Sequence, residues 1–246
     1  MADFPYLYPY SRMDAKSMHE ERKWWDSFYQ NVECARDIEK AINLFFDEDM
    51  EQLKPGCAEA VLEKWGFKRT RFVLANTLAQ EVPQYACQFG QENQDWCKSV
   101  YVPPDGKSNR YFAVDRGIML TDSFIAQSRE AYQALELFGP EHCDSGALDY
   151  EGKVLVLSPD TLREGCWNSR NQLWYSEGGF GCSPTASGRA VYATCLGDGE
   201  QTRWNRADFI GVLKEEFLPD WAREKLTEIQ NLQHTDGPQM GGMTQI

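Results

Sequence analysis

The chain is 246 residues long, enough for one large domain or two modest ones with separate cores. Hydrophobic residues make up 42% of it and aromatic residues 13%, which argues against extensive disorder. The net charge of −13 argues against direct nucleic-acid binding, because that activity needs a basic surface to displace counterions from phosphate. An acidic surface can instead dock onto a basic protein, although the same charge is also an ordinary basis of solubility.

The acidic residues are spread along the chain. Residues 1–145 contain 24 acidic and 16 basic side chains (net −8), and residues 146–246 contain 14 and 9 (net −5). No apolar run approaches the length of a membrane span, and residues 1–10 lack the basic start and apolar core of a signal peptide. We therefore expect a cytoplasmic protein that makes no membrane contact.

The N-terminal part, residues 1–145, is predicted to be a mainly helical domain. A helix is predicted to begin near Asp14, after an aromatic arm. Apolar residues then recur every three or four positions, a pattern typical of an amphipathic helix with one buried stripe. The stripe consists of Trp25, Phe28, Val32, Ala35, Ile38, Ile42 and Phe45. The spacing fits one long helix or two helices with a break near Asn31.

Turn and cap residues divide the following segment into shorter helices. A helix over 57–64 is predicted to end at Gly66, and Thr70 is predicted to cap the next helix. Another helix is predicted over 86–99.

A proline-rich turn over 103–106 then precedes a predicted short strand over 111–114. Asp122 is predicted to cap a helix whose apolar face extends to Phe138, with Gly139-Pro140 as the stop signal.

The composition becomes strand-like after the polar stretch 141–149, so we place the domain boundary there. Four strands are predicted, over Lys153–Leu157, Leu173–Tyr175, Arg189–Leu196 and Glu200–Asn205. Gly197-Asp198-Gly199 is predicted to form the hairpin turn between the last two.

A closing helix is predicted after Pro219, and a disordered tail over 233–246. The fold class is therefore α+β. A helical domain is followed, over 146–232, by a small antiparallel sheet or barrel-like domain with a terminal helix.

A glycine-rich loop follows one of these predicted strands and contains Gly178, Gly179, Phe180 and Gly181. Its backbone could approach an anion, but no Gly-Lys-Ser/Thr follows and no Gly-x-Gly-x-x-Gly opens a helix. Glycines between strands more often mark a turn or bulge, and we favour that interpretation.

The adjacent Cys182 is a weak candidate for a nucleophile, with the distant His142 as its conceivable base. A buried structural cysteine is the favoured interpretation of Cys182.

The eight cysteines contain no Cys-x-x-Cys pair, and we expect buried thiols rather than disulfides. A zinc site could in principle draw on five residues, whose spacing does not match that of structural zinc sites. These are His142, Cys143, Cys166, Cys182 and Cys195. We therefore expect neither a metal nor a cofactor.

Two charged groups could form binding surfaces. Asp47, Glu48, Asp49 and Glu51 make either a docking patch for a protein partner or a solvated helix end, and the solvated end is favoured. A second group lies on or beside the predicted hairpin and is either a small basic patch or a set of cross-strand ion pairs, which we favour. Its members are Arg189, Arg203 and Arg206, with Glu177, Glu200 and Asp208 as the expected partners.

Two stretches of the sequence are similar to known but uncharacterised domains. The first comprises RFVLANTLAQ (Arg71–Gln80) and NQDWCKSVYVP (Asn93–Pro103). The second, Tyr150–Leu226, includes NQLWYSEGGFGCSPTASGRAVYATCLGDGEQTRW and DFIGVLKEEFLPDWAREKL. Both resemble domains of unknown function in polyvalent proteins of phages, plasmids and conjugative elements of gut Firmicutes, often beside antirestriction modules. The resemblance implies a mobile-element context and transfers no catalytic role to any residue.

We therefore expect a non-enzymatic acidic binding protein of a mobile genetic element. Its expected activity is inhibition of a host defence nuclease, of the anti-restriction or anti-CRISPR type, through contact with the basic nucleic-acid channel of that nuclease. One alternative is an adaptor that holds together the transfer or replication machinery of the element. A lesser alternative is a cysteine-dependent enzyme built around Cys182.

Overall fold

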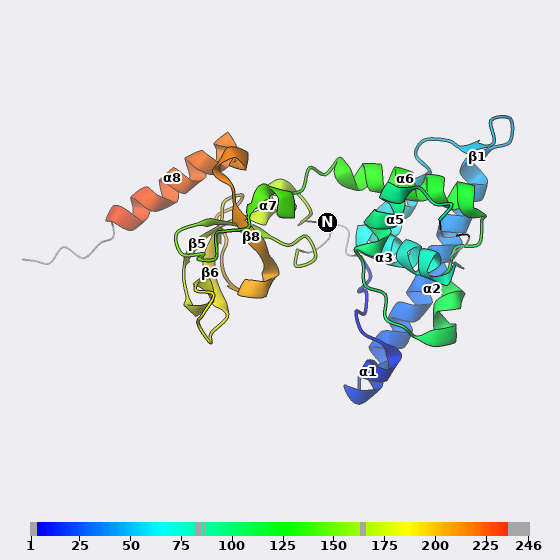
Figure 1. Cartoon of the computed structure of the whole chain (residues 1–246), viewed down its shortest axis with the longest axis horizontal. Helices are drawn as coiled ribbons and strands as arrows, with labels where there is room; N and C mark the ends of the chain where they lie inside the picture. The colour runs from blue at the N-terminus through cyan, green and yellow to red at the C-terminus, as the bar shows by residue number, and fades with distance from the viewer. Residues whose placement is uncertain (1–3, 82–84, 86, 163–165, 236–246) are drawn as a thin grey trace, which may run out of the picture. The chain divides into compact units, whose positions relative to one another are not determined.

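The computed structural model describes residues 4–81, 85, 87–162 and 166–235, and the predicted tail lies outside them from residue 236 onward. The chain divides into two compact units, residues 1–135 and 136–246 (Figure 1). The first unit is helical and the second is built on an antiparallel sheet, so the predicted α+β class is confirmed. The sheet is open, so of the two expected forms, an antiparallel sheet or a barrel-like domain, the sheet is correct.

The helical unit contains α1, α2, a two-stranded hairpin, α3, α5, the 3-10 helix η1 and α6. Their bounds are Arg12–Ser17, Glu21–Phe45, Phe46–Asp47 with Gln52–Leu53, Cys57–Gln80, Gln91–Lys98, Gly106–Phe112 and Ile118–Gln133. Ser11 caps α1 through its side chain and forms a capping box with Asp14. His19 then adopts a φ of 59°, which separates α1 from α2.

The long helix α2 supplies one wall of the helical core. It is continuous, so of the two expected arrangements the single helix is correct. Ala35, Ile38 and Ile42 of the predicted stripe are buried, and they pack with α3 and α6. In the first turns the buried tryptophan is Trp24, while Trp25 is only partly buried. The stripe thus drifts around the helix, as expected for a pattern that does not repeat with the helical period.

Helix α3 passes through a kink at Gly66, where the predicted helix end lies. Gly66 has a φ of 73° and ψ of 171°, values that suit glycine, and the chain resumes its helical path on the other side. Thr70 is buried inside the continuing helix, so its predicted role as a cap is wrong. Arg69 is fully buried beside it and donates hydrogen bonds to the carbonyl oxygens of Tyr6 and Ser27, which ties the N-terminal arm to α2 and α3.

Four other local predictions in the helical unit need correction. Residues 106–112 form η1 instead of a strand, because the side chain of Asn109 donates a hydrogen bond to the carbonyl of Pro103 and its backbone carbonyl accepts one from the side chain of buried Asn76. Asp122 lies inside α6, where its carboxylate accepts hydrogen bonds from Gly90 and Asn93.

Helix α6 ends before the predicted stop, and Glu136, with a φ of 48°, follows it. The helix predicted over 86–99 is shorter in the structure, where α5 spans Gln91–Lys98, and residue 86 is outside the described residues.

The second unit contains a six-stranded antiparallel sheet with the order β3-β8-β4-β5-β6-β7. In chain order its strands are β3 (Cys143–Asp144), β4 (Val154–Leu157), β5 (Leu173–Gly178), β6 (Ala190–Cys195), β7 (Gln201–Asn205) and β8 (Phe209–Leu213). Short helices accompany them: η2 (Pro140–His142), α7 (Ser169–Gln172), η4 (Phe180–Cys182), η5 (Arg206–Asp208), η6 (Glu215–Phe217) and the terminal α8 (Asp220–Thr235). All four predicted strands and the closing helix are confirmed, with small differences at their ends.

Both faces of this sheet are covered. On one face Val156, Leu173 and Tyr175 form a core with Ala222 and Trp221 of α8. On the other face Leu155 lies opposite Trp174, which in turn lies opposite Cys195, and all three side chains are buried. This second face positions the glycine-rich segment, because that segment leaves the end of β5 and returns along β6.

Candidate functional site

The predicted acidic patch forms a β-hairpin that extends from the end of α2 (Figure 1). Phe46 pairs with Leu53 and Asp47 with Gln52, and buried Leu53 fixes the base of the hairpin to the helical core. The side chain of Asp47 accepts hydrogen bonds from the backbone N–H groups of Asp49 and Met50 at 3.1 and 3.3 Å, which orders the turn. The patch is thus a structured hairpin tip and not a helix end.

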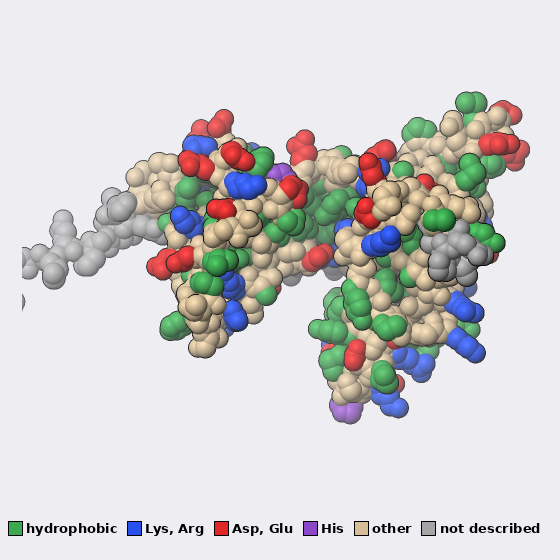
Figure 2. Space-filling model, in the orientation of Figure 1, with side chains coloured by type: hydrophobic (Ala, Val, Ile, Leu, Met, Phe, Trp, Pro, Cys, Tyr) green, Lys and Arg blue, Asp and Glu red, His purple; other side chains and the backbone are tan. Residues whose placement is uncertain are grey.

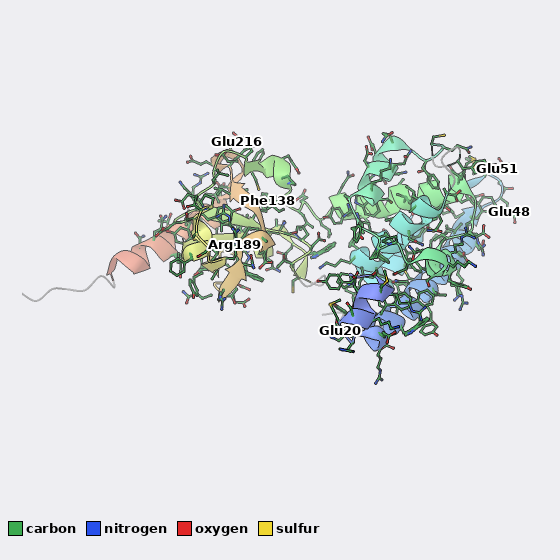
Figure 3. The ribbon with its side chains drawn as sticks, turned by 60° about the horizontal axis from the view of Figure 1, so that its bottom comes forward. Glu20, Glu48, Glu51, Phe138, Arg189 and Glu216 are labelled. Atoms are coloured by element: carbon green, nitrogen blue, oxygen red, sulfur yellow. The ribbon has the colours of Figure 1, made fainter. Side chains whose placement is uncertain are left out.

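The hairpin tip presents acidic and apolar side chains together. Glu48, Asp49 and Glu51 are exposed, and Met50 between them is 65% exposed. Acidic side chains gather at this tip in Figure 2, and Figure 3 shows Glu48 and Glu51 at the edge of the unit. Among the described residues the only ion pair of the four acids joins Asp47 to Lys54 at 3.5 Å, so the tip keeps an excess of negative charge.

The glycine-rich loop folds against the start of β6. A Cβ atom on Gly179 would stand 2.4 Å from the carbonyl oxygen of Ala190, and one on Gly181 would stand 2.4 Å from that of Arg189. Glycine is therefore needed for close backbone approach, and the β5–β6 register shifts between Ser176 and Gly178. This geometry agrees with the favoured turn-or-bulge interpretation and not with a phosphate cradle.

An arginine outside that loop holds it in place. The guanidinium of Arg206 donates hydrogen bonds to the carbonyl oxygens of Gly181, Cys182 and Leu148, at 2.6 to 2.8 Å. It also lies over the ring of Tyr150, 3.8 Å from the centroid. Arg206 thus joins the loop before β4 to the loop after β5, and between them opens a groove of about 420 Å³.

Cys182 lies at this groove as a buried thiol. Its side chain is 2% exposed, and its sulfur is 3.1 Å from the hydroxyl of Ser176. Burial raises the pKa of the Cys182 thiol, which the hydrogen bond with Ser176 only partly opposes. A raised pKa disfavours the thiolate that nucleophilic catalysis requires.

The conceivable base, His142, has its own partners in η2. Its Nδ1 accepts a hydrogen bond from the N–H of Gly139, and its ring packs edge-to-face against Phe138 and Phe217. No hydrogen bond with Cys182 is found among the described residues. The geometry therefore gives the cysteine-enzyme alternative no support.

The expectation of buried thiols is met by six of the eight cysteines, while Cys87 is exposed and Cys166 is partly exposed. Six cysteines are buried and unbridged: Cys34, Cys57, Cys97, Cys143, Cys182 and Cys195. Desolvation raises the pKa of Cys34 and Cys97 to about 12. Within the described part of the chain, no three His, Cys, Asp or Glu side chains come close enough to share a metal ion.

The expected ion pairs around the β6–β7 hairpin are not formed. Among the described residues, no salt bridge joins Arg189, Arg203 or Arg206 to an acidic side chain, and Arg206 binds carbonyl oxygens instead. Glu177 accepts a hydrogen bond from Thr194 at 2.6 Å.

Sequence reasoning missed six of the nine groove residues, among them Asp149, Glu151 and Tyr192. The available signal was the alternation along β6, which places the tyrosine beside the glycine-rich loop.

These features define an α+β protein that has an acidic hairpin on its helical unit and a groove on its sheet unit. The chain belongs to the family described as protein of unknown function (DUF3849), whose family model matches residues 7–133. The match covers 127 of the 246 residues, nearly all of the helical unit, and includes the acidic hairpin. The resemblance to an uncharacterised domain family is thereby confirmed for this unit, while the groove lies beyond the match.

None of the curated proteins and none of the solved structures compared with this chain matches it. Over the described residues, no helix combines the length and apolar character needed to cross a membrane.

Proposed function

We propose that the protein is a non-enzymatic binding protein whose acidic hairpin docks onto a basic surface of another protein. The observation that carries the proposal is the hairpin tip. Three exposed carboxylates flank the exposed Met50 in the sequence, on a turn whose backbone is ordered by Asp47. An exposed apolar side chain among like charges suits an interface with an apolar centre and a charged rim.

The class of partner follows from this charge. Basic surfaces of sufficient size occur on proteins that bind nucleic acid, because such proteins must neutralise phosphates. The mobile-element resemblance makes a host defence nuclease the specific partner that we propose, with the acidic hairpin contacting its nucleic-acid channel. Support for this step comes from the net charge and from the resemblance.

Affinity capture tests the proposal. The tagged full-length protein is incubated with lysate of a Firmicute host at low and moderate salt, and captured proteins are identified by mass spectrometry. We expect a basic nucleic-acid-binding protein that is lost as salt rises, since surface charges are screened over about 8 Å at physiological ionic strength. The hairpin variant Glu48→Gln, Asp49→Asn, Glu51→Gln should lose it, while Asp47 is kept because it orders the turn.

The matched control removes three other exposed carboxylates of the same unit, by Asp26→Asn, Glu63→Gln and Glu130→Gln. This variant has the same net charge as the hairpin variant and should retain the partner. Equal capture by the wild type and the hairpin variant, or equal loss in the control, contradicts the role of the hairpin. Purified partner then allows inhibition of its nuclease activity to be measured directly.

A further inference from the structure

The groove on the sheet unit combines exposed aromatic and acidic side chains. It is bordered by Phe180 of η4, by Tyr192 of β6, and by Asp149 and Glu151 from the loop before β4, and Cys182 also lines it. Phe180 is 78% exposed and Tyr192 53% exposed. Two large aromatic side chains turned to solvent around one groove are unusual on a surface that serves only solubility.

Both aromatic side chains rest on glycines. Tyr192 lies so close to Gly179 that an added Cβ there would be 3.1 Å from its ring, and the Cβ of Phe180 lies 2.6 Å from the position of an added Cβ on Gly188. These glycines allow each side chain to pack directly on backbone while much of its surface remains open. The groove thus has aromatic walls seated on closely packed backbone.

The acidic side chains of the groove are exposed and form no ion pair among the described residues. Asp149 accepts a hydrogen bond from the N–H of Glu151 at 3.1 Å, and no other hydrogen bond to either carboxylate is found in the described part of the chain. The guanidinium of Arg206 donates to three carbonyl oxygens and lies over the ring of Tyr150. Burial is the main cause of the raised pKa of Cys182, the charges of Glu151 and Asp149 add to it, and the charge of Arg206 opposes it.

We propose that this groove binds an arginine side chain of a protein partner, between Phe180 and Tyr192 and beside the carboxylates of Asp149 and Glu151. Aromatic faces attract cations, and carboxylates add a charge-assisted hydrogen bond. Arginine fits better than lysine because its planar guanidinium stacks on a ring while its edge donates to a carboxylate. The site lies outside the family match and on the other unit from the hairpin, so it is independent of the function proposed above.

Calorimetric titration of the full-length protein tests the assignment. The ligand is a synthetic peptide with two arginines among glycines and serines, and the control peptide has citrulline, which is neutral and nearly isosteric, at both positions. We expect binding of the arginine peptide and at least tenfold weaker binding of the citrulline peptide. Phe180→Ala should weaken the arginine peptide by about 2- to 30-fold, the range expected for loss of one cation–π contact. Since Phe180 is largely exposed, this variant should remain folded.

A matched pair of charge variants separates local recognition from net charge. Asp149→Asn with Glu151→Gln removes two negative charges at the groove, and Glu215→Gln with Glu216→Gln removes two in η6. Glu216 lies well away from Arg189, which precedes β6, in Figure 3. Only the groove variant should weaken binding. The proposal is overturned if the citrulline peptide binds equally, if the η6 variant loses as much affinity, or if no heat is detected at millimolar peptide. Equal binding of a lysine peptide overturns the choice of arginine.

Discussion

Asp37 of α2 accepts three hydrogen bonds from other side chains. Lys64 and Trp65 of α3 donate at 2.6 and 3.0 Å, and Lys40 donates at 2.9 Å. Partial burial alone would raise the pKa of Asp37, but these donors lower it to about 2. One carboxylate therefore couples α2 to α3 through charge as well as packing.

The coupling by Asp37 should depend on pH. Because the folded pKa is below the ordinary value of 3.8, the stabilisation is present above about pH 4 and is lost as pH falls through about 2. We expect Asp37→Asn to reduce stability at pH 7 by about 1 kcal/mol, an amount discounted for solvent screening. Thermal unfolding of both proteins from pH 7 to pH 2 measures this difference, which should vanish at the acid end. Asp26→Asn, an exposed position in the same helix, is the control, and a pH-independent difference for Asp37→Asn contradicts the explanation.

At the scale of elements, the segment between β5 and β6 needs glycines in order to pack closely against the backbone at the start of β6. Gly181 does not have a left-handed φ, so close approach is what forbids alanine there: an added Cβ would lie 2.4 Å from the carbonyl oxygen of Arg189 and 2.9 Å from the carbonyl carbon of Ala190. We expect Gly181→Ala to destabilise the sheet unit by about 2 kcal/mol, a typical cost of overpacking. Gly146→Ala is the control, because an added Cβ there would meet only one atom, 3.4 Å away. Chemical denaturation of each variant gives the comparison, and equal stability of the two contradicts the close-approach argument.

Elements with strong local signals were predictable. The stripe of α2, the apolar run of β4 and the Gly197–Gly199 turn each follow from short-range pattern. The strand β8 was missed because Phe209–Leu213 is a short apolar run whose character depends on β3 and β4, its neighbours in the sheet. The 3-10 helix η1 was missed for a similar reason, since buried Asn76 binds it from another helix.

The candidate sites were predictable only in part. The acidic residues and the glycine-rich loop were identified by their composition, but the role of Arg206 depends on carbonyl groups from two separate loops. Every residue has a backbone carbonyl, so the sequence does not show which carbonyls are available to bind an arginine. Cross-strand charge pairing was therefore the natural expectation, and it was wrong.

At the scale of the whole molecule, each unit has a core of its own. The helical core is built around α2, α3 and α6, and the sheet core is built around β4, β5 and α8. Separate cores allow separate cooperative unfolding.

We expect residues 1–135, expressed alone, to be helical by circular dichroism and to melt cooperatively. Gly181→Ala in the full chain should shift only the transition of the sheet unit, and a single transition that moves as a whole contradicts independence.

The six buried thiols make the lifetime of each unit depend on the redox conditions around the protein. Inside the folded protein each is shielded, and burial raises the pKa of Cys57 and Cys195 to about 11. An opened unit exposes its thiols to oxidants at their ordinary reactivity, and a disulfide formed in that state has no counterpart in the native structure. A reversible opening then becomes an irreversible loss of the molecule. In an oxidising medium the rate at which the units open therefore sets the lifetime of this protein. In a reducing medium the exposed thiols are not oxidised, and the opened units can refold.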